Sequence, residues 1–229
     1  MVYLRIIGLI FLGVLFFVQL LTASWYDLVK KTGDKKKTFK HKIICSAVYI
    51  ASFLLCTSIS IGFRGIYAIL LGIALSLLFI HDITEEQSKK ACGIITCILS
   101  SLAYTLISTA LFYKNNAMFD FAPFSPLVCI AIPVAVSVLC ILMSFKTKKA
   151  PPIIACIYMV ANAIMLGSAL QNSGEGLFQG ASCAVIMGSL ALAVATILPV
   201  IDTQDKKSLL RTNLYYFGLM FISCSVAVL

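Results

Sequence analysis

The sequence predicts an all-α integral membrane protein, a single transmembrane domain over residues 1–229 with about eight helices, on the strength of three observations. The composition is 61% hydrophobic and 12% charged, about half the charged fraction of a soluble domain, and the mean hydropathy is +1.02. The apolar residues stand in blocks of about 20, the length that crosses a hydrocarbon core about 30 Å thick. The basic residues lie almost entirely on alternate connections between these blocks.

Eight apolar blocks follow one another along the chain. They cover 6–24, 43–61, 65–81, 91–113, 124–145, 151–170, 178–201 and 212–229. Blocks of this length predict helices, because the strands of a membrane barrel have about ten residues of alternating character. The first block holds about 19 residues and exceeds the 7–15 apolar residues of a secretory signal, so we expect a spanning helix there. The connections are too short to hold a soluble domain.

The distribution of lysine and arginine predicts the orientation of the helices. With eight spans, 15 of the 18 basic residues fall on one side of the membrane, and the largest group is the lysine cluster at 30–42. The positive-inside rule places that side in the cytoplasm and both termini on the non-cytoplasmic side. Such a protein is expected in the plasma membrane of a bacterium or in an internal membrane of a eukaryote. Lysines facing anionic headgroups account for the net charge of +9, so no nucleic-acid partner is expected.

Cysteine and histidine form no metal-binding or disulfide pattern in the sequence. All nine cysteines lie within apolar blocks, none in a CxxC pair, and the two histidines, His41 and His81, stand at block edges. A metal site needs clustered thiolates with histidine or carboxylate partners, which this spacing does not offer. We expect the cysteines to pack as small apolar residues. There is no phosphate-binding loop or nucleophile motif, so neither a metal nor a cofactor is predicted.

No charged residue stands in the middle of an apolar block. Ion-coupled transporters usually carry at least one such residue together with broken helices, so a small-solute transporter is the least favoured alternative. Polar residues within the blocks are expected to form interhelical hydrogen bonds. Gly93, Gly188 and Ser189 are expected at close helix crossings, where small residues let backbones approach each other.

Carboxylates gather instead at two block ends, which the predicted orientation places at the cytoplasmic face. Asp82, Glu85 and Glu86 follow the third block beside His81, and Asp202 and Asp205 follow the seventh block. Taken singly, each is most simply a solvated charge in a connection. An enzyme that acts near lipid headgroups would place its acid and base groups at this depth. Whether the two block ends share one site depends on how the helices pack.

Several local patterns resemble those of the YhhN family of lysoplasmalogenase-like membrane proteins. The resemblance extends over most of the chain and rests on the order and spacing of common membrane residues. The matching segments are Gly72 to Ile80 with His81 and Asp82, Gly93 with Ser100 to Tyr104, Gly188 to Thr196, the pair Tyr215 and Tyr216, and the sixth block with Pro152, Tyr158 and Met165. The resemblance implies an eight-helix fold that hydrolyses the vinyl ether of a lysophospholipid at the cytoplasmic face.

The chain departs from this family at two positions that matter for catalysis. The family's aspartates of the third and seventh spans are thought to be catalytic, and Ile80 and Thr196 stand in their places here. Asp82 lies two residues beyond Ile80, a rotation of about 200° around a helix. Asp202 lies six residues beyond Thr196, about 9 Å along a helix. Vinyl-ether cleavage needs a protonated carboxylic acid and a second group that positions water.

By this resemblance, Asp82 and Asp202 are the predicted catalytic residues, assisted by His81. The predicted substrate-binding residues are Ser76, Ser101, Tyr104, Asn162, Thr196, Tyr215 and Tyr216. The alternative is a catalytically inactive lipid-binding or structural protein of the same family, because neither Ile80 nor Thr196 can act as a carboxylic acid. Membrane lipids are the expected partners in both cases, with a lysophospholipid as the substrate of an active enzyme.

Overall fold

The computed structural model describes residues 2–59, 65–85, 90–114, 131, 135, 138, 142, 152–171, 180–201 and 208–226. This part of the chain contains seven helices and no β-strand, which confirms the predicted all-helical character for these residues. The helices are α1 (Val2–Lys31), α2 (Lys35–Ile59), α3 (Gly65–Glu85), α4 (Lys90–Lys114), α6 (Pro152–Gln171), α7 (Gly180–Ile201) and α8 (Ser208–Cys224). The span predicted at 124–145 lies outside the described residues, except for four isolated positions.

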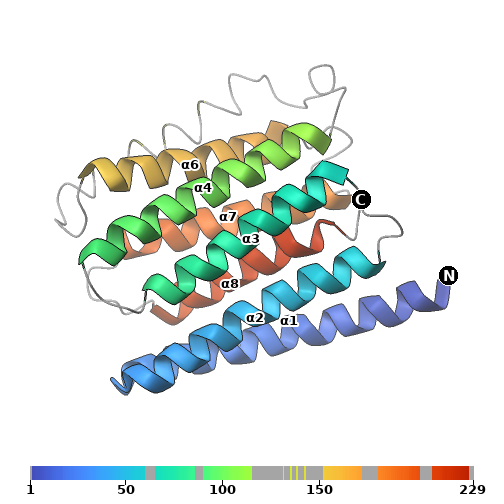
Figure 1. Cartoon of the computed structure of the whole chain (residues 1–229), viewed down its shortest axis with the longest axis horizontal. Coiled ribbons are helices and arrows are strands. Elements are labelled where there is room, and N and C mark those ends of the chain that lie inside the picture. The colour runs from blue at the N-terminus through green and yellow to red at the C-terminus, as the bar shows by residue number, and fades with distance from the viewer. Residues whose placement is uncertain are drawn as a thin grey trace.

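The helices pack side by side into one bundle (Figure 1). α1 packs against α2, α3 against α4, and α7 against α8, and α4 also packs against α6. α8 connects the N-terminal helices to α7, because it contacts α1, α2 and α3 as well as α7. α1 begins and α8 ends at the same end of the bundle, whereas the turn between α1 and α2 lies at the opposite end (Figure 1).

The lysine-rich segment between the first two apolar blocks is mostly helical, with only residues 32–34 outside α1 and α2. Gly33 has a φ of +75°, a left-handed conformation that glycine adopts without strain. Asp34 then caps α2, because its Oδ1 accepts hydrogen bonds from the backbone N–H groups of Lys36 and Lys37, each at 3.1 Å. Lysine is a good helix former, so the change from apolar to polar residues does not end the helices.

The crossing of α7 and α8 depends on two glycines that face each other. A Cβ atom on Gly188 would lie 2.7 Å from the backbone oxygen of Gly218, and a Cβ atom on Gly218 would lie 2.8 Å from the backbone oxygen of Gly188. The two backbones therefore approach more closely than any side chain allows. The close crossing expected at Gly188 is present, and the adjoining Ser189 is fully buried.

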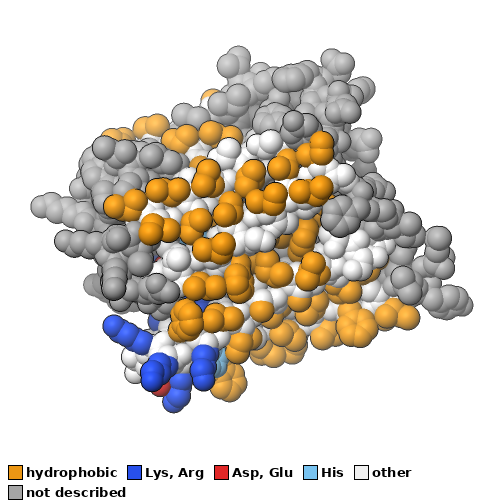
Figure 2. All heavy atoms as spheres, in the orientation of Figure 1, with side chains coloured by type: hydrophobic (Ala, Val, Ile, Leu, Met, Phe, Trp, Pro, Cys, Tyr) orange, Lys and Arg blue, Asp and Glu red, His pale blue; other side chains and the backbone are white. Residues whose placement is uncertain are grey.

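Most of the outer surface that the structure describes is apolar. Large side chains such as Phe17, Leu54 and Leu102 are more than half exposed. They cover the helices, whereas lysines gather at the end that holds the α1–α2 turn (Figure 2). Within the described residues, four helical segments are long and apolar enough to cross a membrane: Ile10–Lys31, Lys35–Ile59, Gly65–Glu85 and Ile94–Leu111. Their apolar outward faces suit contact with lipid rather than with water.

Candidate functional site

A cavity of about 280 Å³ lies at the lysine-bearing end of the bundle. Six helices contribute to its wall: α1, α2, α3, α4, α7 and α8. Its charged lining residues are Lys30, Lys42, Asp82, Glu85 and Arg211. Tyrosine, threonine and serine hydroxyl groups make up most of the remaining polar lining. A cavity with convergent polar groups inside an otherwise apolar bundle is the natural candidate for a binding site.

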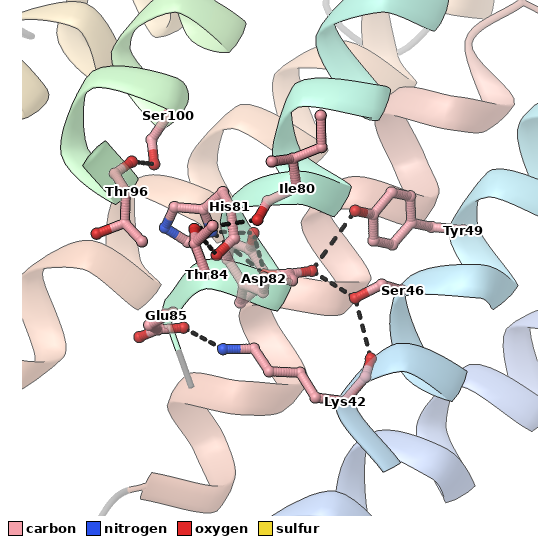
Figure 3. Close-up of polar contacts among 11 residues, drawn as sticks. Lys42, Ser46, Tyr49, Ile80, His81, Asp82, Thr84, Glu85, Thr96 and Ser100 are labelled. Carbon is pink, nitrogen blue, oxygen red and sulfur yellow. Dashed lines mark hydrogen bonds and ion pairs between the residues drawn. The ribbon is translucent and has the colours of Figure 1, made fainter. Parts of the chain in front are cut away.

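Asp82 is the best-connected polar group of this cavity. It stands on α3, one turn before the end of the helix, and is only 1% exposed. Its Oδ2 accepts a hydrogen bond from Ser46 Oγ at 2.6 Å, and its Oδ1 accepts one from the Tyr215 hydroxyl at 2.9 Å. The Tyr49 hydroxyl lies 3.5 Å from Oδ2, and His81 Nδ1 lies 3.3 Å from Oδ1 (Figure 3). Side chains from α2, α3 and α8 therefore fix the carboxyl group.

Ile80 and Asp82 face opposite sides of α3. Two residues rotate the direction of a side chain by about 200° around a helix. The side chain of Ile80 is 45% exposed on the outside of the bundle, whereas Asp82 is buried against the cavity. The carboxyl group at the end of α3 thus enters the cavity, whereas the side chain two residues before it does not.

Ser46 lies between Asp82 and a backbone carbonyl. Its Oγ is 2.6 Å from Asp82 Oδ2 and 3.0 Å from the Lys42 backbone oxygen, both within hydrogen-bonding distance. A serine hydroxyl has a single hydrogen and can donate it to only one of these oxygens. Both contacts are satisfied at once when Asp82 Oδ2 carries a proton and donates it to Ser46, which then donates to the carbonyl. The network therefore accommodates the neutral carboxylic acid as well as the carboxylate.

Lys42 and Glu85 form an ion pair at the same cavity and join α2 to α3 (Figure 3). The Lys42 side chain is 4% exposed, whereas that of Glu85 is 54% exposed. The Lys42 ammonium group also lies 5.9 Å from the ring centroid of Tyr26, and Lys30 lies at the same distance from this ring. A tyrosine ring at this range attracts a cation. The cations are thus held between α1, α2 and α3.

Tyr216 presents a buried hydroxyl group that lacks a hydrogen-bond partner among the described residues. The residue lines the cavity and is 1% exposed. Its ring is fixed by the rings of Tyr26, Tyr49 and Tyr215, with centroids 6.5, 6.4 and 5.1 Å away. A buried hydroxyl without a hydrogen bond destabilises the folded state by about 1–3 kcal/mol. We therefore expect a ligand or a bound water to form a hydrogen bond with the Tyr216 hydroxyl.

The structure brings five of the ten predicted site residues together. His81, Asp82, Thr196, Tyr215 and Tyr216 all line the cavity. His81 and Asp82 of α3 therefore line the same cavity as Thr196 of α7, whereas the carboxylates that follow the seventh block, Asp202 and Asp205, lie outside the described residues.

Other predicted residues lie behind the cavity wall or away from it. Asn162 on α6 donates a hydrogen bond of 3.1 Å to Thr196 Oγ1 and so contacts the cavity through that residue. Ser101 and Tyr104 are buried within the bundle but are not part of the lining. Ser76 is exposed, and its hydroxyl donates to the backbone oxygen of Gly72. Asp202 lies outside the described residues.

Sequence reasoning missed the contribution of α2. Lys42, Ser46 and Tyr49 stand at positions i, i+4 and i+7, and they face the cavity network together (Figure 3). This spacing puts three polar groups on one face of a helix, which was a usable signal at the start of the second apolar block. Sequence reasoning also missed Tyr26, Lys30 and Arg211, because these residues lie outside the apolar blocks, in segments that were predicted to be connections.

One group of side chains has the composition of a metal site. Ligand atoms of His81, Asp82 and Glu85 lie within 4.8 Å of one another. However, Glu85 is engaged by the ammonium group of Lys42, and both Asp82 oxygens accept hydrogen bonds from hydroxyl groups. A divalent cation would have to displace these donors and sit beside a buried lysine. The donors therefore suit a proton-transfer or anion-binding site better than a cation site.

The chain matches no protein-family model, no curated protein and no solved structure. What the cavity does is therefore inferred from its own chemistry: a buried carboxyl group, converging cations and an unpaired hydroxyl group.

Proposed function

We propose that the chain is an integral membrane protein of eight spans, with the cavity at its cytoplasmic face and both termini on the other side. Two observations support this topology. The cavity lies at the bundle end that carries the α1–α2 lysines, and the positive-inside rule assigns such an end to the cytoplasm. α1 begins and α8 ends at the opposite end, as an even number of spans requires.

We further propose that the protein is a divergent lysoplasmalogenase-like enzyme of the YhhN family, which hydrolyses the vinyl ether of a single-chain lysophospholipid. The observation that carries this proposal is the buried carboxyl group of Asp82, held by Ser46 and Tyr215 inside a cavity at one end of the bundle. A poorly hydrated carboxyl group is suited to act as a general acid on a substrate without charge at its reacting atoms.

In this reaction Asp82 transfers its proton to the β-carbon of the vinyl ether, and the carbon–carbon double bond becomes a single bond. The positive charge then resides on the oxocarbenium ion, next to the aspartate carboxylate. Water adds to the charged carbon and loses a proton, which returns to the carboxylate. The resulting hemiacetal collapses to an aldehyde and a glycerophospholipid with a free hydroxyl group, so one water is consumed for each ether cleaved.

Other residues near Asp82 are suited to position the water and to exchange protons. The Thr196 and Tyr216 hydroxyl groups line the same cavity as Asp82 and are suited to position the attacking water. His81 contacts both Asp82 and Tyr215 through Nδ1, at 3.3 and 3.5 Å, and is suited to exchange protons with them. Asp202 stays a predicted second carboxylate.

Purified protein with a 1-alkenyl lysophospholipid tests this proposal through the rate of aldehyde release. We expect Asp82→Asn to lower the rate by about 10²–10⁴-fold, the contribution of general acid catalysis. Ile80→Val is the matched control, because that side chain lies two residues away on the outer face, and its rate should stay at the wild-type value. Equal rates for wild type and Asp82→Asn would sink the assignment.

A second function is favoured by Thr196. This residue lines the cavity on α7, where the YhhN pattern has a carboxylic acid, and threonine cannot replace that acid. A catalytically inactive protein that binds the same lipid would show binding without aldehyde release. In that case Thr196→Asp should introduce measurable hydrolysis, whereas an active wild-type enzyme excludes this function.

A further inference from the structure

We infer that the cations of the cavity form a binding site for a phosphate group, with Lys42 at its centre. The inference rests on the proposed function and adds that the phosphate of the lysophospholipid binds to the cationic side chains of the cavity. Three cationic side chains from three different helices contribute to the lining: Lys30 of α1, Lys42 of α2 and Arg211 of α8. Lys42 is the buried member of this group, and a buried cation is costly unless it is paired with an anion.

Lys42 is the most deeply placed of these cations. Its side chain is 4% exposed, and it enters the cavity one turn from Ser46 on the same face of α2. The ring of Tyr26 lies beside both Lys42 and Lys30, which keeps the two ammonium groups close to one aromatic surface. The two cations thus approach the cavity from neighbouring helices.

Glu85 occupies the position on Lys42 that an anionic ligand would take. Its side chain is 54% exposed, so its carboxylate can leave the ammonium group and be hydrated in water. A phosphate group offers more acceptor oxygens than a carboxylate and makes charge-assisted hydrogen bonds with lysine and arginine. The entering phosphate therefore exchanges with Glu85, and Lys42 keeps an anionic partner throughout.

The position of this site relative to Asp82 fits a glycerophospholipid. Asp82 and Glu85 are three residues apart on α3, about 4.5 Å along the helix. A phosphate on Lys42 near Glu85 would therefore place the far end of a glycerol backbone near the Asp82 carboxyl group. Asp82 itself is bonded to hydroxyl groups rather than to the lysines, so its carboxyl group does not compete with the phosphate for the cations, although it lies next to them.

The test compares the binding of two lipids that the enzyme cannot hydrolyse. They are 1-alkyl-glycerol and 1-alkyl-glycerol-3-phosphate with the same chain, and their affinities for the purified full-length protein are measured by native mass spectrometry. We expect the phosphate lipid to bind the wild-type protein at least about tenfold more tightly, because the phosphate makes charge-assisted hydrogen bonds that the neutral lipid lacks. Inorganic phosphate serves as a third ligand, and its competition at similar concentrations would identify a soluble phosphate compound as the occupant.

Four variants separate this site from a general effect of charge. Lys42→Gln and Arg211→Gln should abolish the preference for the phosphate lipid and leave the affinity for the neutral lipid unchanged. Glu85→Gln should strengthen phosphate binding, because it removes the competing carboxylate and keeps Lys42. Lys40→Gln is the matched control, since this exposed lysine of α2 lies outside the cavity lining.

Three results would overturn the inference: no preference in the wild-type protein, a preference that persists in both cation variants, or weaker phosphate binding in Glu85→Gln. Glu85→Gln keeps the test decisive if Lys42→Gln fails to fold, because it retains the lysine. Because neither lipid is hydrolysed, the result does not depend on the chemistry assigned to Asp82, and a failure of hydrolysis would leave the phosphate site standing.

Discussion

The Tyr215 hydroxyl donates a hydrogen bond of 2.9 Å to Asp82 Oδ1, and this bond joins α8 to α3 across the cavity. The tyrosine ring packs edge-on against Tyr216 at a centroid distance of 5.1 Å, so the direction of the donor is fixed by α8. Ser46 reaches the other oxygen of the same carboxyl group from α2. Asp82 is thus positioned by two helices that are far from it in sequence.

Tyr215→Phe removes this donor and keeps the ring. We expect the rate of ether hydrolysis to fall by about tenfold or more, because a hydrogen bond to a charged or charge-developing group contributes about 1.5–3 kcal/mol. Tyr67→Phe is the matched control. It removes another buried tyrosine bond, 2.6 Å to Ser225, and lies outside the cavity lining. Steady-state rates and thermal unfolding together decide: a rate loss of equal size in both variants would contradict a positioning role for Tyr215.

The α7–α8 crossing predicts a large effect of one added methyl group. Gly188→Ala and Gly218→Ala each place a Cβ atom less than 3 Å from the opposing backbone, so the helices must separate. Overpacking of this kind typically costs about 1–3 kcal/mol.

Gly13→Ala is the control for this pair, because a Cβ at that position meets no atom within 4 Å. In detergent, the midpoint of thermal unfolding should be lower than in the wild type for Gly188→Ala and Gly218→Ala. It should not be lowered for Gly13→Ala. Unchanged midpoints at both crossing positions would contradict the close approach of α7 and α8.

The Asp34 cap predicts a pH dependence at the start of α2. The backbone N–H of Lys37 bonds the Asp34 carboxylate and holds its pKa below the ordinary value of 3.8. A carboxylate with a lowered pKa stabilises the folded state fully above the unfolded value and loses this effect as the pH falls through the folded-state pKa. Amide hydrogen exchange of Lys36 and Lys37 should therefore show protection that decreases only below about pH 4.

Asp34→Asn separates the charge from the cap. Asparagine is also a good N-cap residue, so protection near neutral pH should remain while the acid-induced loss disappears. Asp34→Ala should lose protection at every pH. A pH dependence that survives in Asp34→Asn would assign it to another group.

The proposed topology predicts which side of the membrane each helix end faces. An epitope inserted after Gly33, in the α1–α2 turn, should become accessible to antibody only after the membrane is permeabilised. The same epitope appended to the C-terminus should be accessible from the non-cytoplasmic side without permeabilisation. The opposite pattern would reverse the orientation, and equal accessibility of both epitopes would contradict an even number of spans.

The existence of the helices could be predicted from the sequence, and their ends could not. Apolar blocks long enough to span a membrane predict helices, because the backbone must satisfy its own hydrogen bonds in lipid. Polar residues at 30–42 gave no such signal, and α1 and α2 continue into them since helix ends depend on caps such as Asp34. Hydropathy reports contact with lipid, whereas the ends depend on local hydrogen bonds.

The candidate site could be predicted only in part for a related reason. The charged residues at the end of α3 pointed to His81 and Asp82, and the motif resemblance pointed to Tyr215 and Tyr216. The alignment of motifs pointed to Ile80, because a motif of common membrane residues does not fix which face of a helix is buried. Helix packing decides that point, and it directs Asp82 into the cavity.

The measurement that tests the central claim most directly is the hydrolysis of a 1-alkenyl lysophospholipid in D₂O, with the released aldehyde trapped by reduction. Proton transfer to the β-carbon of the vinyl ether predicts one deuterium on the carbon next to the former aldehyde carbon. It also predicts that the labelled product is lost in Asp82→Asn and retained in Ile80→Val. An unlabelled aldehyde, or a labelled one formed at the wild-type rate by Asp82→Asn, would contradict general acid catalysis by Asp82.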